Sequence, residues 1–306
     1  MTASPSHPET DPALTAAMAE AGLTPGRSPA PVRLPDAAPL FAGRAARLRH
    51  LAPGHSLEAW LSFLAQVADA QQAVIGAGDG GTPDRQWLPD LRALMARLDG
   101  RVPDTARPAF AALAARLDGD PADGDEGVAG IARRLMDGSA GPDDLAPAPF
   151  VVAALQTAWT RHAAGLDPAT VAASATAFGC PVCGSPPAAG VIHTGMEAGG
   201  LRYLHCGLCH TAWHHVRTTC IACGEGHQLT YHALTPAAGD AAVHADTGAR
   251  AEACGGCHAY LKLFLAEKVP GLDPLADDLA TLALDLLVGE EGFRRINVNP
   301  LLVLAG

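Results

Sequence analysis

The chain has 306 residues, and its 32 Asp and Glu against 21 Lys and Arg give a formal net charge of −11. An acidic surface repels polyanions, so this charge argues against binding to nucleic acid or to an anionic membrane. The length suggests about two domains. An apolar fraction of 48% is enough to build a core in each of them.

No segment resembles a targeting or membrane-spanning sequence. Residues 1–30 contain no positively charged start followed by a long apolar run, so we expect no signal peptide. The apolar stretch from Leu279 to Val288 is interrupted by Asp285 and is too short to cross a bilayer. We therefore predict no membrane insertion and a cytoplasmic location, where thiols remain reduced.

The first half of the chain has the periodicity of helices. Residues 1–34 are rich in Pro, Ser, Thr and Ala and are predicted to form a flexible segment, with a short helix at Pro12–Ala21. Residues 35–170 are predicted to form an all-helical domain, because apolar side chains recur every three or four residues. In the clearest helix, from Leu57 to Val74, Ser56 is a candidate N-cap. The other predicted helices are Leu91–Leu98, Phe110–Leu117, Ile131–Met136 and Phe150–His162.

The second half changes character at about residue 176, where glycine becomes frequent and short strand-like runs appear. These runs are Val191–His193, Leu201–His205, Leu229–His232 and Ala242–His244. Strands this short bury little apolar surface, so another interaction must stabilise the region. Within residues 263–306 one C-terminal helix is predicted, from Pro274 to Gly289. Its apolar stripe is formed by Leu275, Leu279, Leu282 and Leu286.

All eight cysteines lie in this second half, and every one belongs to a Cys-x-x-Cys pair. The pairs are Cys180/Cys183, Cys206/Cys209, Cys220/Cys223 and Cys254/Cys257. In a reducing compartment this pattern indicates metal ligation rather than disulfides. Two such turns supply four thiolates, which is a full tetrahedral set for zinc or iron.

The spacing favours pairing of neighbouring turns. The gap within the first two pairs is 22 residues and that within the last two is 30, whereas only ten residues separate Cys209 from Cys220. We therefore predict a first four-cysteine module at 176–216 and a second at 217–262, with a cross-braced arrangement as the alternative. Gly184 and Gly224 directly follow a knuckle and are expected in a left-handed conformation. Four sulfurs suit zinc and iron alike, and structural zinc is the simplest interpretation of the spacing.

Histidines also gather around the cysteines. They are His193, His205, His210, His214, His215, His227, His232, His244 and His258. Because eight cysteines complete two sites, we expect these histidines to be neighbours of the sites or exposed strand residues rather than ligands.

The sequence contains no recognisable catalytic motif. We find no nucleophile elbow, phosphate-binding loop, His-Glu-x-x-His or dinucleotide fingerprint. The adjacent acids Asp277/Asp278 and Glu290/Glu291 are interpreted as solvated charges at helix ends. We therefore predict that the protein is not an enzyme.

Several segments resemble the formate dehydrogenase accessory protein FdhE family. They are the run Cys180-Pro-Val-Cys-Gly-Ser-Pro, the run Gly200-Leu-Arg-Tyr-Leu-His-Cys-Gly-Leu-Cys, the link Cys254-Gly-Gly-Cys-His-Ala-Tyr-Leu-Lys, and the C-terminal stretch from Ala276 that ends in Asn299-Pro-Leu-Leu. The resemblance covers about residues 30–304 and is most specific in the last part of the chain.

This resemblance implies a cytoplasmic accessory factor for the assembly or maturation of respiratory formate dehydrogenase. Such a factor binds the catalytic subunit before its export by the twin-arginine pathway. The family's paired cysteines are associated with rubredoxin-like iron, so the resemblance implies two iron ions here, with zinc as the alternative. If exposed, Tyr203, Trp213, His214 and His215 are candidate contacts with the partner.

The predicted fold class is α+β: an all-helical N-terminal domain, two small rubredoxin- or zinc-ribbon-like metal modules, and a C-terminal helix. Two other functions compete with the accessory role. A rubredoxin-like electron carrier would use the same four-cysteine sites. A zinc-ribbon nucleic-acid-binding protein would need a basic face, but residues 178–260 contain three arginines against five acids. The sequence leaves the oligomeric state open.

Overall fold

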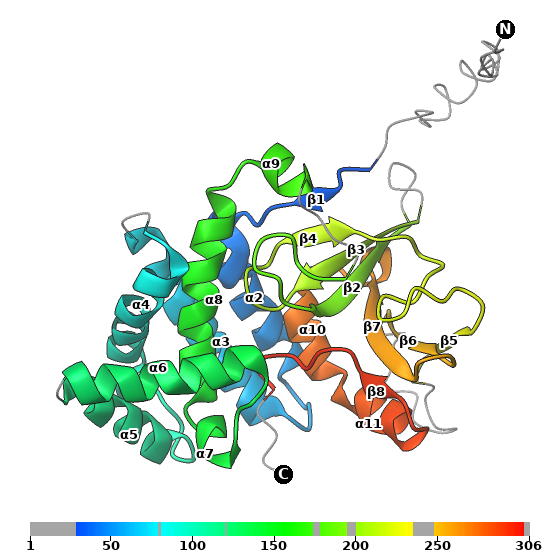
Figure 1. The fold of residues 1–306 in the computed structure, drawn as a ribbon. Helices are drawn as coiled ribbons and strands as arrows, with labels where there is room; N and C mark the ends of the chain where they lie inside the picture. Colours follow the sequence, from blue (N-terminus) through cyan, green and yellow to red (C-terminus); the bar gives the residue numbers. More distant parts are fainter. Residues whose placement is uncertain are drawn as a thin grey trace, which may run out of the picture.

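A computed structural model describes residues 29–78, 81–119, 121–173, 178–194, 200–234 and 248–302. The helix predicted at Pro12–Ala21 and the strand predicted at Ala242–His244 lie outside these residues. In the described part, a group of helices is followed by a sheet that carries the cysteines, and further helices come after the sheet (Figure 1). The fold is mixed α+β, as predicted.

The helical half begins after a short strand, β1 (Val32–Arg33). Its helices are α2 (Ala37–Leu51), α3 (Glu58–Val74), α4 (Pro83–Leu98), α5 (Arg107–Asp118), α6 (Pro121–Asp137), α7 (Pro142–Leu145), α8 (Ala148–Ala164) and α9 (Pro168–Ala173), with a 3₁₀ turn, η1 (Ile75–Ala77), after α3. Proline occupies the first turn of α4, α5, α7 and α8, where its missing N–H costs nothing.

The entry into α3 differs from the prediction. The helix begins at Glu58, and no side chain caps it, so Ser56 is not its N-cap. Instead, the backbone N–H of Leu57 donates to His55 Nδ1 over 2.9 Å, and the N–H of Gly54 donates to Glu58 Oε2 over 3.0 Å. These two hydrogen bonds to side chains fix the turn that leads into the helix, and no side chain caps the helix itself.

The described sheet contains eight strands, β1 included. The others are β2 (Pro187–His193), β3 (Leu201–Cys206), β4 (Ala212–His214), β5 (Leu229–His232), β6 (Ala249–Cys254), β7 (Ala259–Leu265) and β8 (Arg294–Arg295). Their order is β1-β4-β3-β2-β7-β6-β5, and β8 pairs with β7. The two cysteine modules are joined where β2 runs parallel to β7, with Gly190 opposite Leu263. They are therefore two halves of one sheet. The boundaries of the five segments predicted from the sequence stay predictions.

Helix α8 connects the two halves of the molecule. In Figure 1 it lies between α4 on one side and α2 on the other, and all but a few of its residues are buried. One hydrophobic core includes Phe150 and Val151 of α8 together with Leu204 of β3 and Leu261 of β7. The sheet thus packs on the helical half, which supplies the apolar contacts that short strands lack.

The predicted C-terminal helix is two helices, α10 (Pro274–Ala280) and α11 (Leu282–Glu290), after a 3₁₀ turn, η2 (Ala266–Lys268). They separate at Thr281, because Lys262 Nζ binds the carbonyl oxygen of Asp278 at 2.6 Å and Thr281 Oγ1 at 3.0 Å. The predicted apolar stripe is therefore wrong beyond the break. Leu284 faces the core, whereas Leu286 is 60% exposed.

The acids of α10 are also not solvated. Asp277 and Asp278 are 4% and 1% exposed, because α10 packs between α2 and the sheet. Asp277 pairs with Arg47 at 2.5 Å and Asp278 with Lys262 at 2.9 Å. Two buried carboxylates are stable there only because each has a cation beside it. Glu290 and Glu291 are exposed, as predicted.

Candidate metal centres

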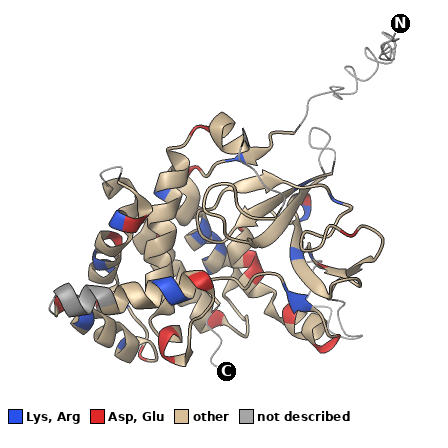
Figure 2. Cartoon of the chain, in the orientation of Figure 1, with Lys and Arg blue, Asp and Glu red and all other residues tan. Residues whose placement is uncertain are grey.

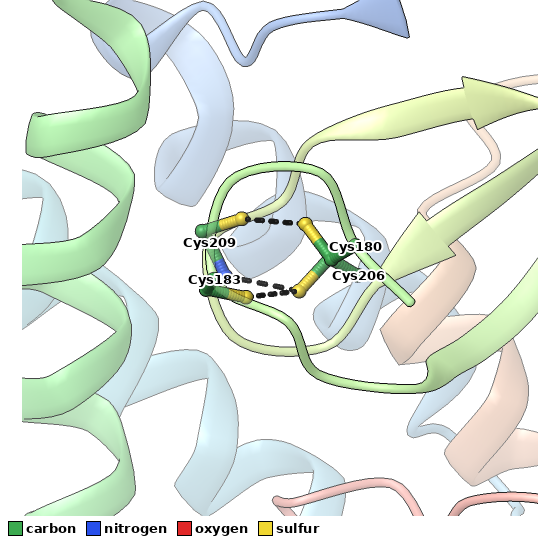
Figure 3. Close-up of side chains that lie close together, drawn as sticks. All are labelled: Cys180, Cys183, Cys206 and Cys209. Atoms are coloured by element: carbon green, nitrogen blue, oxygen red, sulfur yellow. Dashed lines mark hydrogen bonds between the residues drawn. The ribbon is translucent and has the colours of Figure 1, made fainter. Parts of the chain in front are cut away.

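The first cluster joins a loop before β2 to the turn that links β3 and β4. Cys180 and Cys183 come from the loop, and Cys206 and Cys209 come from the turn (Figure 3). The sulfur of Cys180 lies 3.4 Å from that of Cys209, and the sulfur of Cys183 lies 3.3 Å from that of Cys206. The backbone N–H groups of Leu208 and Cys209 point at Cys206 Sγ over 3.3 and 3.4 Å. Such N–H groups stabilise thiolate charge.

The second cluster repeats this arrangement on the other half of the sheet. Cys220 and Cys223 precede β5, and Cys254 and Cys257 lie in the turn between β6 and β7. The sulfurs of Cys220 and Cys257 are 3.7 Å apart, as are those of Cys223 and Cys254. The predicted pairing of neighbouring turns is confirmed: each set of four sulfurs lies within 4.8 Å, and the cross-braced alternative is wrong.

The donor geometry fits a tetrahedral metal ion. A metal–sulfur bond of about 2.3 Å places the four sulfurs of a tetrahedron about 3.8 Å apart. The observed separations of 3.3–3.7 Å are close to this value, and no donor other than sulfur is needed. Each cluster can therefore hold one metal ion. A set of four sulfurs suits zinc and iron equally well, so this geometry does not identify the metal.

The thiols of these clusters must lose protons when a metal binds. Burial raises the pKa of Cys206 and Cys209 above the usual value and raises that of Cys220 to about 12. Hydrogen bonds with Cys180 and Cys206 instead lower the pKa of Cys183. A bound cation reverses the effect of burial by favouring the thiolates, so binding releases protons and weakens in acid.

Backbone conformation at the two clusters follows the prediction. Gly184 and Gly224 both have φ +76, the left-handed conformation that glycine adopts without a steric cost. Their N–H groups donate to the carbonyl oxygens of Cys180 and Cys220, each over 2.8 Å. The equivalent residues of the other two turns are His210 and His258, with φ 60 and 57.

Three family profiles match the chain one after another. The N-terminal FdhE profile matches residues 29–81 and 77–176, the central-domain profile matches 179–217, and the C-terminal-domain profile matches 218–302. The chain belongs to the FdhE family. The resemblance found in the sequence is therefore confirmed over both clusters and the helical half.

Individual FdhE relatives agree in length and fold. The Protein FdhE homolog of Edwardsiella ictaluri is 37% identical over 297 residues, which cover 89% of this chain and 91% of that protein. The Protein FdhE homolog of Pseudomonas aeruginosa is 35% identical, and the match covers 93% of this chain and 98% of that protein. The crystal structure of the FdhE protein from Pseudomonas aeruginosa matches with a TM-score of 0.74 at 32% identity, over 90% of this chain and 99% of that one.

In this FdhE chain, His210 is neither a ligand nor exposed. Its Nδ1 lies 2.7 Å from Thr160 Oγ1 of α8, and its Nε2 lies 3.0 Å from Arg44 Nη1 of α2. Because arginine only donates, Nε2 must accept and Nδ1 must carry the proton, so the ring is neutral. Burial accordingly lowers the pKa of His210 well below its usual value. The sequence did not predict that Thr160 and Arg44 contact this turn, since neither lies near a cysteine along the chain.

Two of the proposed partner contacts are core residues. Tyr203 is fully buried and Trp213 is 1% exposed, whereas His214 and His215 are half-buried. Tyr203 OH donates to the carbonyl oxygen of Ala30 over 2.9 Å, so the segment before β1 covers it. Tyr203 and Trp213 therefore cannot contact a partner in this conformation.

In the described residues that Figure 2 shows from one side, acidic and basic positions are mixed. Acidic and basic residues are interspersed over the helices in the view of Figure 2. Of the three arginines in the cluster region, Arg202 is fully buried and pairs with Glu252 at 2.5 Å. Among the described residues, none of the helices is long and apolar enough to cross a bilayer.

Proposed function

We propose that this protein is an accessory factor for the maturation of formate dehydrogenase, which binds the catalytic subunit in the cytoplasm before export and is not itself an enzyme. Membership of the FdhE family over residues 29–302 is the observation that supports this role. The adjacent acids Asp277 and Asp278, which the sequence suggested were solvated charges, also support it. Asp277 and Asp278 are buried in ion pairs with Arg47 and Lys262, which is a structural arrangement.

We further propose that each four-cysteine cluster binds one metal ion, iron in the cell and zinc as the alternative. The first ion would be held by Cys180, Cys183, Cys206 and Cys209, and the second by Cys220, Cys223, Cys254 and Cys257. The support is the near-tetrahedral spacing of the sulfurs. Iron on four thiolates would supply one-electron redox reactivity, whereas zinc would supply only structure.

An anaerobic pull-down with a purified formate dehydrogenase catalytic subunit tests the role. The bait is the full chain, either wild type or with one cysteine pair changed to serine: Cys180/Cys183 or, as a matched variant, Cys220/Cys223. Metal content is measured on the same samples, with circular dichroism as the check of folding. We expect capture by the wild type and two metal ions per chain, each variant losing one ion.

The outcomes separate the two parts of the proposal. Loss of capture in one folded variant and not in the other would assign docking to that half of the sheet. Failure of the wild type to capture the subunit would overturn the accessory role. Capture by a wild type that holds no metal would overturn the metal assignment alone.

A further inference from the structure

The turns that close the two clusters have the same backbone and almost the same sequence. The first is Cys206-Gly-Leu-Cys-His and the second is Cys254-Gly-Gly-Cys-His. Each ends in a left-handed histidine, and each leads into the next strand of its half of the sheet. The two turns differ only at Leu208 and Gly256, so a difference between the two sites comes from that position and from what packs around the turns.

The first turn is enclosed by the rest of the molecule. Gly207, Leu208, Cys209 and His210 are all buried. Gln156 of α8 donates to the carbonyl oxygen of Gly207 over 2.7 Å, and a Cβ placed on Gly207 would lie 3.0 Å from Pro300 Cδ.

The cysteines of this cluster are part of the main core. Cys180, Cys206 and Cys209 pack in it, with Cys183 half-buried at its edge. In Figure 3 the cluster faces α8. The approach for an incoming ligand is therefore narrower here than at an exposed cysteine, because α8 covers one side and Cys183 on the other is half-buried.

The second turn lies at the surface. Gly255, Gly256 and His258 are exposed, and Cys257 is half-buried. Cys223 is itself exposed, as are its neighbours Ala222 and Gly224.

The contacts around this turn are few and peripheral. The nearest neighbour of a Cβ on Gly255 would be Gln228, which is at the surface, and the ring of His258 lies tilted against that of Phe293 with centroids 5.8 Å apart. None of the four cysteines belongs to the hydrophobic clusters of the described residues. Cys223 can therefore turn outward without breaking any core contact.

This difference has a chemical consequence for metal exchange. A metal ion passes between thiolate sites when an incoming ligand bonds to it as a resident thiolate leaves. In the first step at a loaded second site, one metal–Cys223 bond would break and one metal–sulfur bond to the incoming thiol would form, with no electron transferred. The proton that the incoming thiol gives up is taken by the released Cys223 thiolate. Such a step needs an accessible thiolate on the metal site, and Cys223 of the second cluster is exposed, whereas the most accessible cysteine of the first, Cys183, is half-buried.

We propose that the second cluster is a metal-exchange site, which gives its ion to or takes it from a thiol-bearing acceptor through Cys223, while the first cluster is a structural metal site that fastens the sheet to α8. This inference rests on the proposed binding of metal by both clusters. It assigns different roles to two sites that the motif makes look alike.

Chelator competition on the full chain tests the assignment. Anaerobic protein loaded with zinc is mixed with excess 4-(2-pyridylazo)resorcinol, and zinc release is followed by absorbance. We expect two phases of one ion each, with rates that differ by at least about tenfold, because the first site must open locally before it reacts. A pulse of N-ethylmaleimide at the end of the fast phase, read by mass spectrometry, should label Cys220, Cys223, Cys254 and Cys257.

Matched variants identify each phase independently. Cys223→Ser should lose the fast phase, keep the slow one and melt close to the wild-type temperature. Cys183→Ser, the equivalent half-buried ligand of the first site, should lose the slow phase and melt at a clearly lower temperature. The wild-type labelling stands even if Cys183→Ser does not fold.

The results that contradict the proposal are distinct. A single phase that releases two ions, or labelling of Cys180 or Cys209 during the fast phase, would overturn the exchange role while leaving metal binding intact. Fewer than two zinc ions in the loaded wild type would overturn the metal assignment, and the exchange role with it.

Discussion

Leu208 and Gly256 hold the same position in the two closing turns, yet Leu208 lies in the core and Gly256 lies at the surface. Leu208 packs beside the cysteines of the first cluster, which binds that turn to the helical half. Gly256 has no side chain to pack, and α8 does not reach it. A Cys-x-x-Cys turn therefore specifies how sulfurs are aimed but not whether the site that they form is closed or open.

The largest effect is expected where the second half of the sheet is anchored without metal. Lys262 of β7 is fully buried, with its Nζ 2.9 Å from Asp278 Oδ1 and 2.6 Å from Asp285 Oδ2. Lys262→Met would leave these carboxylates with Arg295 as their remaining cation. We expect a loss of about 3–5 kcal/mol in the free energy of unfolding, measured in urea.

Lys268→Met is the matched control, because Lys268 is exposed. It should change the free energy of unfolding by less than about 0.5 kcal/mol. Equal effects of the two substitutions would mean that the buried ion pairs do not anchor this half of the sheet. If Lys262→Met has a large effect and Lys268→Met does not, the buried ion pairs hold this half of the sheet. This would explain how the second cluster can lose a metal ion while the fold persists.

The second prediction compares the glycines that follow the first cysteine of each closing turn. An alanine at Gly207 would place its Cβ 3.0 Å from the half-buried ring of Pro300 and 3.1 Å from the fully buried Ala188, and neither of these short side chains can turn away. Gly207→Ala should therefore lower the free energy of unfolding by about 1–3 kcal/mol. Gly255→Ala meets the flexible side chain of Gln228 and should cost less than about 0.5 kcal/mol. Thermal melts of the zinc-loaded proteins would decide, and equal losses would contradict the difference in packing.

The third prediction compares the two left-handed histidines. His210→Ala leaves Arg44 Nη1 and Thr160 Oγ1 without a partner in the core, which should cost about 1–3 kcal/mol. His258→Ala carries the same backbone change but loses only a surface contact with Phe293. The difference between the two variants, measured in urea, isolates the side-chain network. Two equal losses would show that backbone strain, not the network, is what each histidine contributes.

The smallest effect is expected far from both clusters. A hydrogen bond from Arg134 lowers the pKa of Asp144 from 3.8 to about 2. A carboxylate with a lowered pKa stabilises the fold above its ordinary value of 3.8 and loses this contribution as the pH falls through about 2. The stability difference between wild type and Asp144→Asn should therefore shrink over that range. Neither phase of zinc release should change at neutral pH.

Asp143→Asn serves as its control, because Asp143 is the exposed neighbouring acid of the same short helix. At neutral pH this variant should change the free energy of unfolding, measured in urea, by less than about 0.5 kcal/mol. A change in zinc release caused by Asp144→Asn would mean that the clusters respond to the helical half at long range.

Local chemistry allowed much of this protein to be predicted from its sequence. The spacing of the Cys-x-x-Cys turns predicted which sulfurs meet, because a short gap cannot hold the hairpin that a knuckle pair needs. Gly184 and Gly224 indicated left-handed residues, because glycine has no Cβ to clash. The helix from Leu57 to Val74 appeared close to its predicted bounds, because its apolar period is visible within one segment.

Features that depend on distant partners were decided only by the tertiary structure. Asp277 looked like a surface charge until Arg47, 230 positions away, was found beside it. The predicted stripe at Leu286 failed because Lys262, on a separate strand, takes the carbonyl group at which α10 and α11 divide. Tyr203 and Trp213 were candidate contacts with a partner in the sequence. They are buried because the segment before β1 and the helices cover the sheet, which local sequence does not reveal.

The two four-cysteine clusters also combine features that the sequence determines with features that only the tertiary structure decides. The sequence by itself determined that there are two sets of four thiolates and how each set is aimed, because a knuckle's geometry depends on only a few consecutive residues. Only the tertiary structure decided that α8 and the C-terminal segment pack against the turn of the first cluster, while Cys223 of the second lies at the surface. Burial is a property of the whole packed chain, and two nearly identical motifs can therefore differ in it.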